Sequence, residues 1–520
     1  MKNPLEPWEM VIGLEVHAQM RTRSKIFCAC STRFGAEPNT QICPVCAAFP
    51  GVLPVLNREV VTLAIKTGLG LQGEIRGHSE FSRKNYFYPD LPAGYQITQY
   101  EWPIVLGGQV AINTADGRSR RIGLTRIHLE VDAGKSLHEG ISGASWIDLN
   151  RTGTPLMEIV SEPDLRSSEE AGEFLKKLRA ILRYLEVCDG NMEEGSLRCD
   201  ANVSVRRGPE APFGTRCELK NLNSIRNVMR AIDHEAERQI EILESGGRID
   251  QETRLWDADR GVTRTMRDKE DAHDYRYFPE PDLPPLVVDA ARIAAVAATL
   301  PELPDARLDR FRTEYGLSDY DAGVLTMSRE LADYFEECLR EVTRGDRGDA
   351  KREENSAERE RHGAGKDQGG SREGQGDTRE SQGNAKVVAN WVSVELLARL
   401  NRDGVEITAS PVPAARLGRL LALLAGGSIS GKIAKEVFDI MFRSGEDPEA
   451  IVAARGLNQL SDVAALEKEV LQVLEANPRE VAAYRAGKSK LLGFFVGQVM
   501  RATRGKANPE LLNRILLEKL

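Results

Sequence analysis

Residues 11–20, VIGLEVHAQM, decide the fold of the first half of this 520-residue chain. Ile12, Leu14, Val16 and Ala18 recur at every second position, which is the period of a β-strand that buries one face. The other face carries Glu15, His17 and Gln19. This stretch therefore predicts a strand that turns an apolar face toward a core and presents carboxylate and imidazole groups on the opposite side.

Three further segments repeat this alternation: 125–135 (TRIHLEVDAGK), 195–205 (GSLRCDANVSV) and 215–223 (TRCELKNLN). Their polar faces carry His128, Glu130, Asp132, Arg198, Asp200, Asn202, Arg216, Glu218 and Lys220. A polar face by itself needs no function, because antiparallel sheets commonly leave one face in water. Here every strand offers an acid beside a histidine or a basic residue. Such groups suit Mg²⁺ bound to phosphate oxygens, so the pattern predicts a divalent-metal and phosphate site.

The rest of the chain divides by its periodicity. Amphipathic helices are predicted over 167–187, which opens with a capping box at Ser167 and Glu170, and from Ser224 to the glycines at 246–247. We expect both helices to cover the sheet. Strand patterns end near residue 295, and helical patterns follow. The fold class is therefore predicted as α+β, with an antiparallel-sheet domain over 1–295, an all-α middle domain over 296–410 and an all-α tail over 411–520.

One segment fits no element. Residues 344–385 contain no Val, Ile, Leu, Met, Phe, Tyr, Trp or Cys. A segment of this composition cannot bury enough apolar surface to offset the entropy of ordering its backbone. We therefore expect a disordered insert within the helical middle domain.

The composition excludes several classes of protein. Apolar residues make up 41% and charged residues 29% of the chain, an ordinary globular balance. No apolar run is long enough for a membrane span, and the N-terminus has no signal-peptide core, so we expect a cytoplasmic protein without a membrane partner. The net charge of −9 confines any nucleic-acid contact to a local basic patch.

Four of the eight cysteines are clustered at Cys28, Cys30, Cys43 and Cys46. Two close pairs joined by a loop are typical of a structural zinc site, and a closed four-thiolate site leaves no position open for catalysis. Four free thiols are the alternative. The remaining cysteines are scattered and are expected in the core.

Several long motifs carry a family resemblance, among them VIGLEVH, RKNYFYPDLPAGYQI, DLNRTGTPLMEIVSEPDL, EGSLRCDANVSVR, ELKNLNS and DYRYFPEPDLPPL. They resemble the B subunits of the aspartyl/glutamyl-tRNA amidotransferases, over nearly the whole chain except 344–385. The resemblance implies a kinase-like (cradle) N-terminal domain that uses ATP and Mg²⁺ to phosphorylate the side chain of Glu on tRNA(Gln) or of Asp on tRNA(Asn). Ammonia from the amidase, which is the A subunit, then forms the amide, and the small C subunit completes a heterotrimer.

The resemblance also implies roles for particular residues. Glu15, His17 and Glu130 match the family's Mg²⁺ ligands, and Lys84, Asp200 and Glu218 match the rest of its phosphoryl-transfer pocket. It supports Zn²⁺ at the four clustered cysteines and a tail that binds the body of the tRNA. Residues 481–520 fit that role, since they carry eight Lys and Arg against two Glu. The alternative function is a non-catalytic tRNA-binding scaffold whose polar sheet face is merely solvated.

Overall fold

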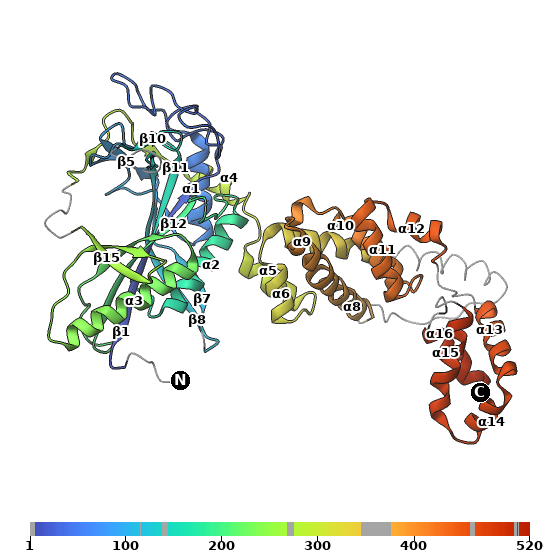
Figure 1. The fold of residues 1–520 in the computed structure, drawn as a ribbon. Helices are drawn as coiled ribbons and strands as arrows, with labels where there is room; N and C mark the ends of the chain where they lie inside the picture. The colour runs from blue at the N-terminus through green and yellow to red at the C-terminus, as the bar shows by residue number, and fades with distance from the viewer. Residues whose placement is uncertain are drawn as a thin grey trace. The chain divides into compact units, whose positions relative to one another are not determined.

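The computed structural model describes residues 6–114, 116–137, 144–267, 275–344, 376–457, 463–503, 507 and 509–520. These residues belong to two units, Met1–Leu303 and Pro304–Leu520. The first unit contains the sheet, and the second is built mainly from helices (Figure 1). The predicted combination of an N-terminal sheet region with a helical C-terminal part is confirmed. Among the described residues, no helix has the length and apolar content needed to cross a membrane.

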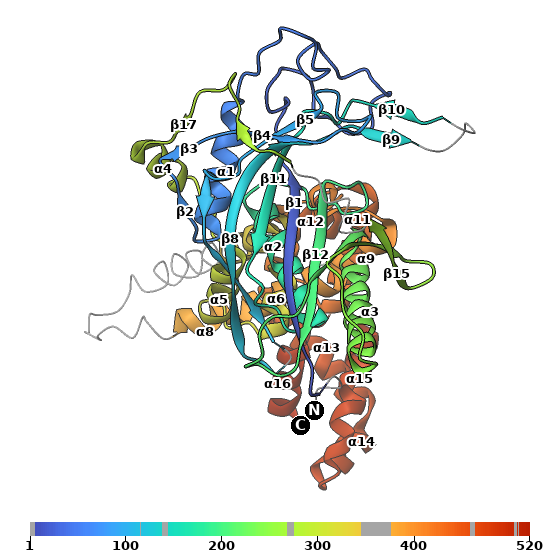
Figure 2. The same ribbon diagram turned by 90° about the vertical axis from the view of Figure 1, so that its left-hand side faces the viewer.

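A ten-stranded sheet forms the frame of the first unit. Its order is β15 (Val262–Arg267), β14 (Thr253–Asp257), β13 (Cys217–Leu222), β12 (Leu197–Arg206), β1 (Glu9–Gln19), β11 (Pro155–Ser161), β8 (Ser119–Val131), β6 (Val105–Leu106) and β2 (Glu74–Ile75), and β7 (Gln109–Asn113) also pairs with β8. Figure 2 shows the long strands β8, β11, β1 and β12 side by side. Neighbouring strands are antiparallel except for the parallel pair of β13 and β14. The four predicted strand segments correspond to β1, β8, β12 and β13, so these predictions are confirmed.

Helices pack on one face of this sheet. They are α1 (Arg58–Gly70), α2 (Ser168–Tyr184) and α3 (Ile225–Glu244), and α4 (Ala290–Ala297) packs beside α1. The hydroxyl groups of Ser167 and Ser224 cap α2 and α3 as N-caps, which confirms both predicted helices. The apolar face of β1 joins these helices in one core, where Ile12 and Val16 have no exposed surface. The polar face of the sheet is therefore the one that these helices do not cover.

Short strands lie across one end of the long strands (Figure 2). A three-stranded sheet joins β4 (Ser82–Asn85), β5 (Tyr95–Thr98) and β16 (Phe278–Pro279). Two-stranded pairs join β9 (Lys135–Leu137) with β10 (Trp146–Asp148) and β3 (His78–Ser79) with β17 (Leu286–Val287). Because β4 carries Lys84, this small sheet brings a cation to the large one.

The second unit contains two apolar cores, one spanning Phe311 to Val452 and one spanning Leu466 to Leu516. Its described helices are α5 (Pro304–Thr313), α6 (Asp319–Leu325), residues 329–344, α8 (Gly376–Asn390), the π-helical turn Trp391–Leu396, α9 (Leu397–Asp403), α10 (Ala414–Ala425), α11 (Gly431–Ser444), α12 (Pro448–Arg455), α13 (Val463–Ala476), α14 (Pro478–Arg485), α15 (Leu492–Ala502) and α16 (Pro509–Lys519). The predicted boundary at 410/411 falls inside the first core. There the hydroxyl of Tyr334 donates to the carbonyl of Val412 at 2.7 Å.

The prediction of disorder over 344–385 is wrong at its C-terminal end. Helix α8 begins at Gly376, and Ala385 within it is fully buried in the helical core. A helix propagates more easily than it nucleates, so the buried turns that follow can extend it into polar sequence. Arg344, the first residue of the predicted insert, is also helical. The rest of the predicted insert, 345–375, lies outside the described residues.

Candidate active site

The polar face of the large sheet opens into a cavity of about 690 Å³. All six residues predicted for the metal and phosphoryl-transfer site line it: Glu15, His17, Lys84, Glu130, Asp200 and Glu218. They come from five strands, β1, β4, β8, β12 and β13. The structure therefore brings together side chains that lie up to about 200 residues apart in the sequence.

Strand register explains this convergence. Glu15 of β1 pairs with Asp200 of β12, and His17 pairs with Glu158 of β11. Glu158 in turn pairs with His128 of β8. Residues that are paired across neighbouring strands share one face of a sheet and lie in contact distance. Glu15 and Asp200 therefore lie side by side, and His17, Glu158 and His128 form a row across β1, β11 and β8.

His17, Glu130 and Glu158 form the group best suited to a metal ion. One potential ligand atom of each lies within 4.8 Å of those of the other two. His17 Nε2 is 3.2 Å from a Glu158 oxygen and 3.9 Å from a Glu130 oxygen. The predicted ligand Glu15 lines the same cavity but lies outside this group, and its Oε1 accepts a hydrogen bond from the Asn202 side chain at 2.9 Å.

The charges of this group depend on one another. Burial by itself would lower the pKa of His17, but its hydrogen bond to Glu158 and the charges of Glu158 and Glu130 raise that pKa to about 9. Burial would raise the pKa of Glu158, but the two histidines and Lys84 outweigh burial and lower it. The side chain of His128 is buried, and its Nδ1 has no hydrogen-bond partner among the described residues. The acids of the site thus stabilise positive charge, which the protonated His17 ring carries here and which a metal ion would carry when bound to the deprotonated ring.

Two lysines face the cavity in different states. Lys220 Nζ is 2.7 Å from carboxylate oxygens of both Asp200 and Glu218. The positive charge of Lys220 is therefore already compensated by these two carboxylates. Burial opposes the charge of Lys84, but Glu130 and nearby groups raise its pKa, so it remains cationic. No carboxylate among the described residues lies within ion-pair distance of Lys84, whose Nζ sits 4.8 Å from the ring centre of Tyr275. Lys84 is therefore available to meet an anionic substrate, as are Arg126 and Arg216, which line the same cavity and form no ion pair among the described residues.

Sequence reasoning missed Glu158 as a candidate site residue. On its face of β11 it is flanked by Leu156 and Val160, so the segment does not alternate between apolar and polar residues. The pairing with His17 and His128 was the signal that identified it, and pairing cannot be read from one strand. His128 lies on the polar face, as its parity predicts, and its pairing with Glu158 adds it to the site.

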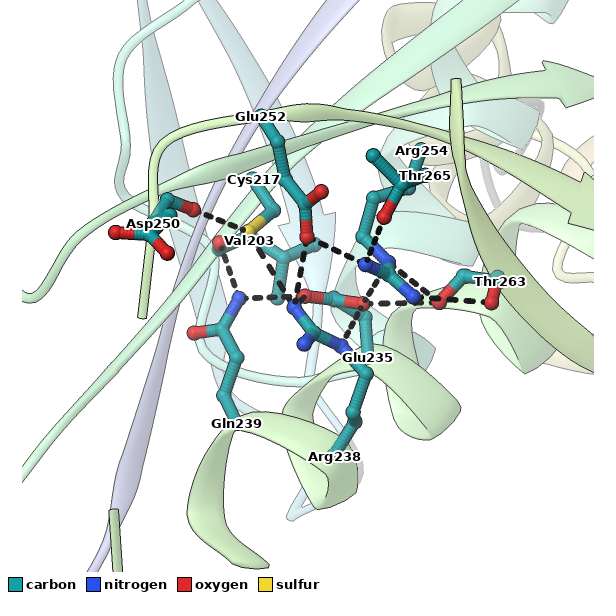
Figure 3. Close-up of polar contacts among 10 residues, drawn as sticks. All are labelled: Val203, Cys217, Glu235, Arg238, Gln239, Asp250, Glu252, Arg254, Thr263 and Thr265. Carbon is teal, nitrogen blue, oxygen red and sulfur yellow. Dashed lines mark hydrogen bonds and ion pairs between the residues drawn. The ribbon is translucent and has the colours of Figure 1, made fainter. Parts of the chain in front are cut away.

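A buried polar network lies beneath strands β12 to β15, on the helix side of the sheet (Figure 3). Its centre is Glu235 of α3, which has no exposed surface. Glu235 accepts hydrogen bonds from Arg238 at 2.6 Å and Thr263 at 3.1 Å, and it pairs with Arg254 of β14 at 3.3 Å. Gln239 adds a further hydrogen bond to Glu235 at 2.8 Å.

Residues of this network contact residues that line the cavity. Arg254 pairs with Glu252, and Glu252 and the intervening Thr253 both line the cavity. The hydroxyl of Thr253 donates to Glu218 at 2.8 Å. Strand β14 pairs with β13 next to Glu218, and the side-chain contacts from α3 add to this pairing in holding Thr253 beside Glu218.

The four clustered cysteines also lie close together, and their Sγ atoms are all within 4.8 Å of one another. Cys46 Sγ lies 4.0 Å from Cys30 Sγ and 3.9 Å from Cys43 Sγ. A tetrahedral site with Zn–S bonds of about 2.3 Å places its sulfurs about 3.8 Å apart, so this donor set fits zinc. The fully buried Lys25 donates to Cys46 Sγ at 3.5 Å and to the Gln41 carbonyl at 2.8 Å. Its positive charge would offset part of the charge of four thiolates.

Comparisons with known proteins agree with the motifs. Residues 10–294 match the family profile described as the GatB/GatE catalytic domain, and residues 377–520 match the one described as the GatB domain. The chain is similar to the B subunit of the aspartyl/glutamyl-tRNA(Asn/Gln) amidotransferase of Halorhodospira halophila, with 55% identity over 513 residues and 99% of each chain covered. It is 51% identical over 519 residues to that of Carboxydothermus hydrogenoformans, again with 99% of each chain covered. The chain belongs to the family of B subunits of the aspartyl/glutamyl-tRNA(Asn/Gln) amidotransferases.

Proposed function

We propose that this protein is the ATP- and Mg²⁺-dependent kinase subunit of a tRNA-dependent amidotransferase. Its substrates are Glu-tRNA(Gln), Asp-tRNA(Asn) or both. The observation that carries the proposal is the grouping of His17, Glu130 and Glu158 in the same cavity as Lys84, which has no carboxylate partner among the described residues. A solvated sheet face would not require buried acids, whereas a phosphoryl-transfer site does.

The chemistry consists of two steps. The side-chain carboxylate of the aminoacyl group attacks the γ-phosphorus of ATP, an O–P bond forms, and ADP leaves. Ammonia then attacks the acyl carbon, the C–O bond to phosphate breaks, and the nitrogen loses a proton to give the amide and inorganic phosphate. The first step is required because a free carboxylate has no adequate leaving group.

Residues of the cavity have distinct roles in the first step. His17, Glu130 and Glu158 would hold Mg²⁺, with Glu15 beside them, and the ion would supply charge neutralisation at the phosphate oxygens. Lys84 binds the transferring phosphoryl group, because an ammonium held away from carboxylates gains most from a new anion. Asp200 and Glu218 hold Lys220, and these three side chains form another part of the cavity lining.

The second step requires partners. Ammonia would come from the amidase, the A subunit, and the small C subunit would complete a heterotrimer. The N-terminal unit acts as a kinase-like cradle, zinc at the four cysteines has a structural role, and the basic C-terminal helices bind the tRNA body. Support for these assignments comes from the family resemblance, from the sulfur geometry and from the charge of residues 481–520.

Isotope transfer tests the proposed reaction. Glu-tRNA(Gln) labelled with ¹⁸O in the side-chain carboxylate is converted by the reconstituted complex with ATP and glutamine. An acyl-phosphate intermediate transfers one ¹⁸O from the carboxylate to inorganic phosphate, which mass spectrometry detects. Unlabelled phosphate accompanied by amide formation would contradict the proposal. Unlabelled phosphate released with no amide would favour the scaffold alternative, and so would wild-type amidation by a complex that carries Lys84→Met.

A further inference from the structure

A pair of stacked tyrosines lines the cavity. The rings of Tyr100 and Tyr277 are parallel to within 5°, with their centres 4.1 Å apart. Both residues line the cavity, and Tyr100 is 43% exposed. One face of each ring is occupied by the other ring, so the outer face of Tyr100 remains a flat aromatic surface at the cavity edge.

This surface connects to the reactive centre through aromatic rings. Tyr277 contacts Tyr275 edge-to-face, with ring centres 6.0 Å apart. Tyr275 in turn lies under the ammonium group of Lys84. A ligand stacked on Tyr100 would therefore have its remaining atoms within reach of Lys84 and of the acids beyond it.

Aromatic and basic groups continue away from the cavity. Trp102, two residues after Tyr100, is 40% exposed. The Arg76 guanidinium lies 5.1 Å from the centre of its ring, and His78 contacts the same ring edge-to-face. Exposed aromatic rings with arginine beside them are typical of surfaces that bind single-stranded nucleic acid by base stacking.

We infer that the outer face of Tyr100, backed by Tyr277, is a stacking platform for an adenine base, and that this base is the 3′-terminal adenosine of the aminoacyl-tRNA. The inference rests on the proposed function, in which the aminoacyl group enters the cavity. Only a ribose and a short amino acid separate the terminal adenine from the reacting carboxylate, so that base must lie at the cavity edge. ATP is the other source of adenine, but it has a single base, whereas Trp102 and Arg76 offer further contacts that suit the preceding nucleotides of a single strand.

A two-by-two binding experiment tests this inference. The full chain, assembled with its partner subunits, is titrated with uncharged tRNA(Gln) that has the complete 3′ end or lacks only the terminal adenosine. The wild-type complex should bind the complete tRNA about 5- to 150-fold more tightly, as expected for one stacked base. With Tyr100→Ala this preference should disappear, and with Tyr100→Phe, which keeps the ring, it should persist.

Other outcomes would overturn the inference. If Tyr100→Ala weakened binding of both tRNAs equally, or changed neither, the ring would have no specific role toward the terminal base. If instead it raised the KM for ATP while the preference for the complete tRNA persisted, the platform would belong to ATP. Thermal melting distinguishes a loss of folding from a loss of base stacking, because the Tyr100→Ala and Tyr100→Phe variants should have similar melting temperatures. The binding measurement does not depend on catalysis, so an absence of amidation by the wild-type complex would refute the proposed function and leave this result to be judged by itself.

Discussion

Replacing Glu235 by glutamine tests the network that supports the cavity. This change keeps the size of the side chain and removes its charge. In the wild-type protein the carboxylate neutralises Arg238 and Arg254 and has no exposed surface. Glu235→Gln would also turn an NH₂ group toward donors that now bond to oxygen. We therefore expect a large loss of stability that is local to α3 and strands β13 to β15.

The structure indicates the size of this loss. Breaking a buried ion pair by removing one partner costs about 3–5 kcal/mol, because the other charge is left uncompensated. Glu252 still pairs with Arg254 and lies 3.8 Å from Arg238, which softens the effect. The expected loss is thus near the lower end, about 3 kcal/mol.

Amide hydrogen exchange of peptides from α3 and β14 is the appropriate assay, because it reports the free energy of local opening. Glu237→Gln on the exposed side of the same helix is the matched control, and it should change stability by no more than about 0.5 kcal/mol.

The pH dependence of stability provides a second check. Burial opposes ionisation of Glu235, but Arg238 and its other partners lower its pKa below the ordinary value of 4.5. Its contribution is therefore complete above pH 4.5 and is lost as the pH falls through the lowered value. A loss below about 1 kcal/mol at neutral pH would refute this reasoning.

Three further predictions concern other parts of the chain. Metal analysis should find about one zinc per chain, and Cys43→Ser with Cys46→Ser should remove it; zinc retained by the double variant would place the ligands elsewhere. Replacing 345–375 by a short Gly-Ser linker should leave amidation within a fewfold of wild type, since loop length costs little free energy, and a large loss would show that the segment binds something. Deleting 463–520, which removes the second helical core, should weaken tRNA binding and flatten its salt dependence. Equal affinity and equal slope at two salt concentrations would show that the basic residues in 481–520 are ordinary surface.

Periodicity predicted the parts of the structure in which one strand or helix carries its own signal. Residues 11–20 alternate without interruption, so both the strand and the direction of Glu15 and His17 followed from parity. The N-caps Ser167 and Ser224 likewise marked the helix starts. Side chains alternate between the two faces of a strand, so parity correctly predicted that most of the site residues share one face of the sheet.

Features that depend on contacts between distant segments were missed. Glu158 lies in a strand that does not alternate, and only its neighbours on β1 and β8 assign it to the site. Lys84 came from the family resemblance alone, since β4 has four residues and no apolar alternation. Helix α8 extends into polar sequence because its later turns are buried. The predicted boundary at 410/411 lies within an apolar core that begins at Phe311 and that α10 to α12 complete.

Glu130→Gln tests most directly whether the polar face of the sheet performs phosphoryl transfer. The side chain of Glu130 is almost fully buried and belongs to the candidate metal group, so the substitution removes charge without changing shape. The measurement is the rate of ADP and amide formation from Glu-tRNA(Gln) by the reconstituted complex. Glu162→Gln is the matched control, because Glu162 accepts a hydrogen bond from Thr125 and does not belong to the candidate metal group. We predict that Glu130→Gln lowers both rates by orders of magnitude while glutamine hydrolysis by the amidase persists and the control stays near wild type. Near wild-type amidation by Glu130→Gln would contradict the account.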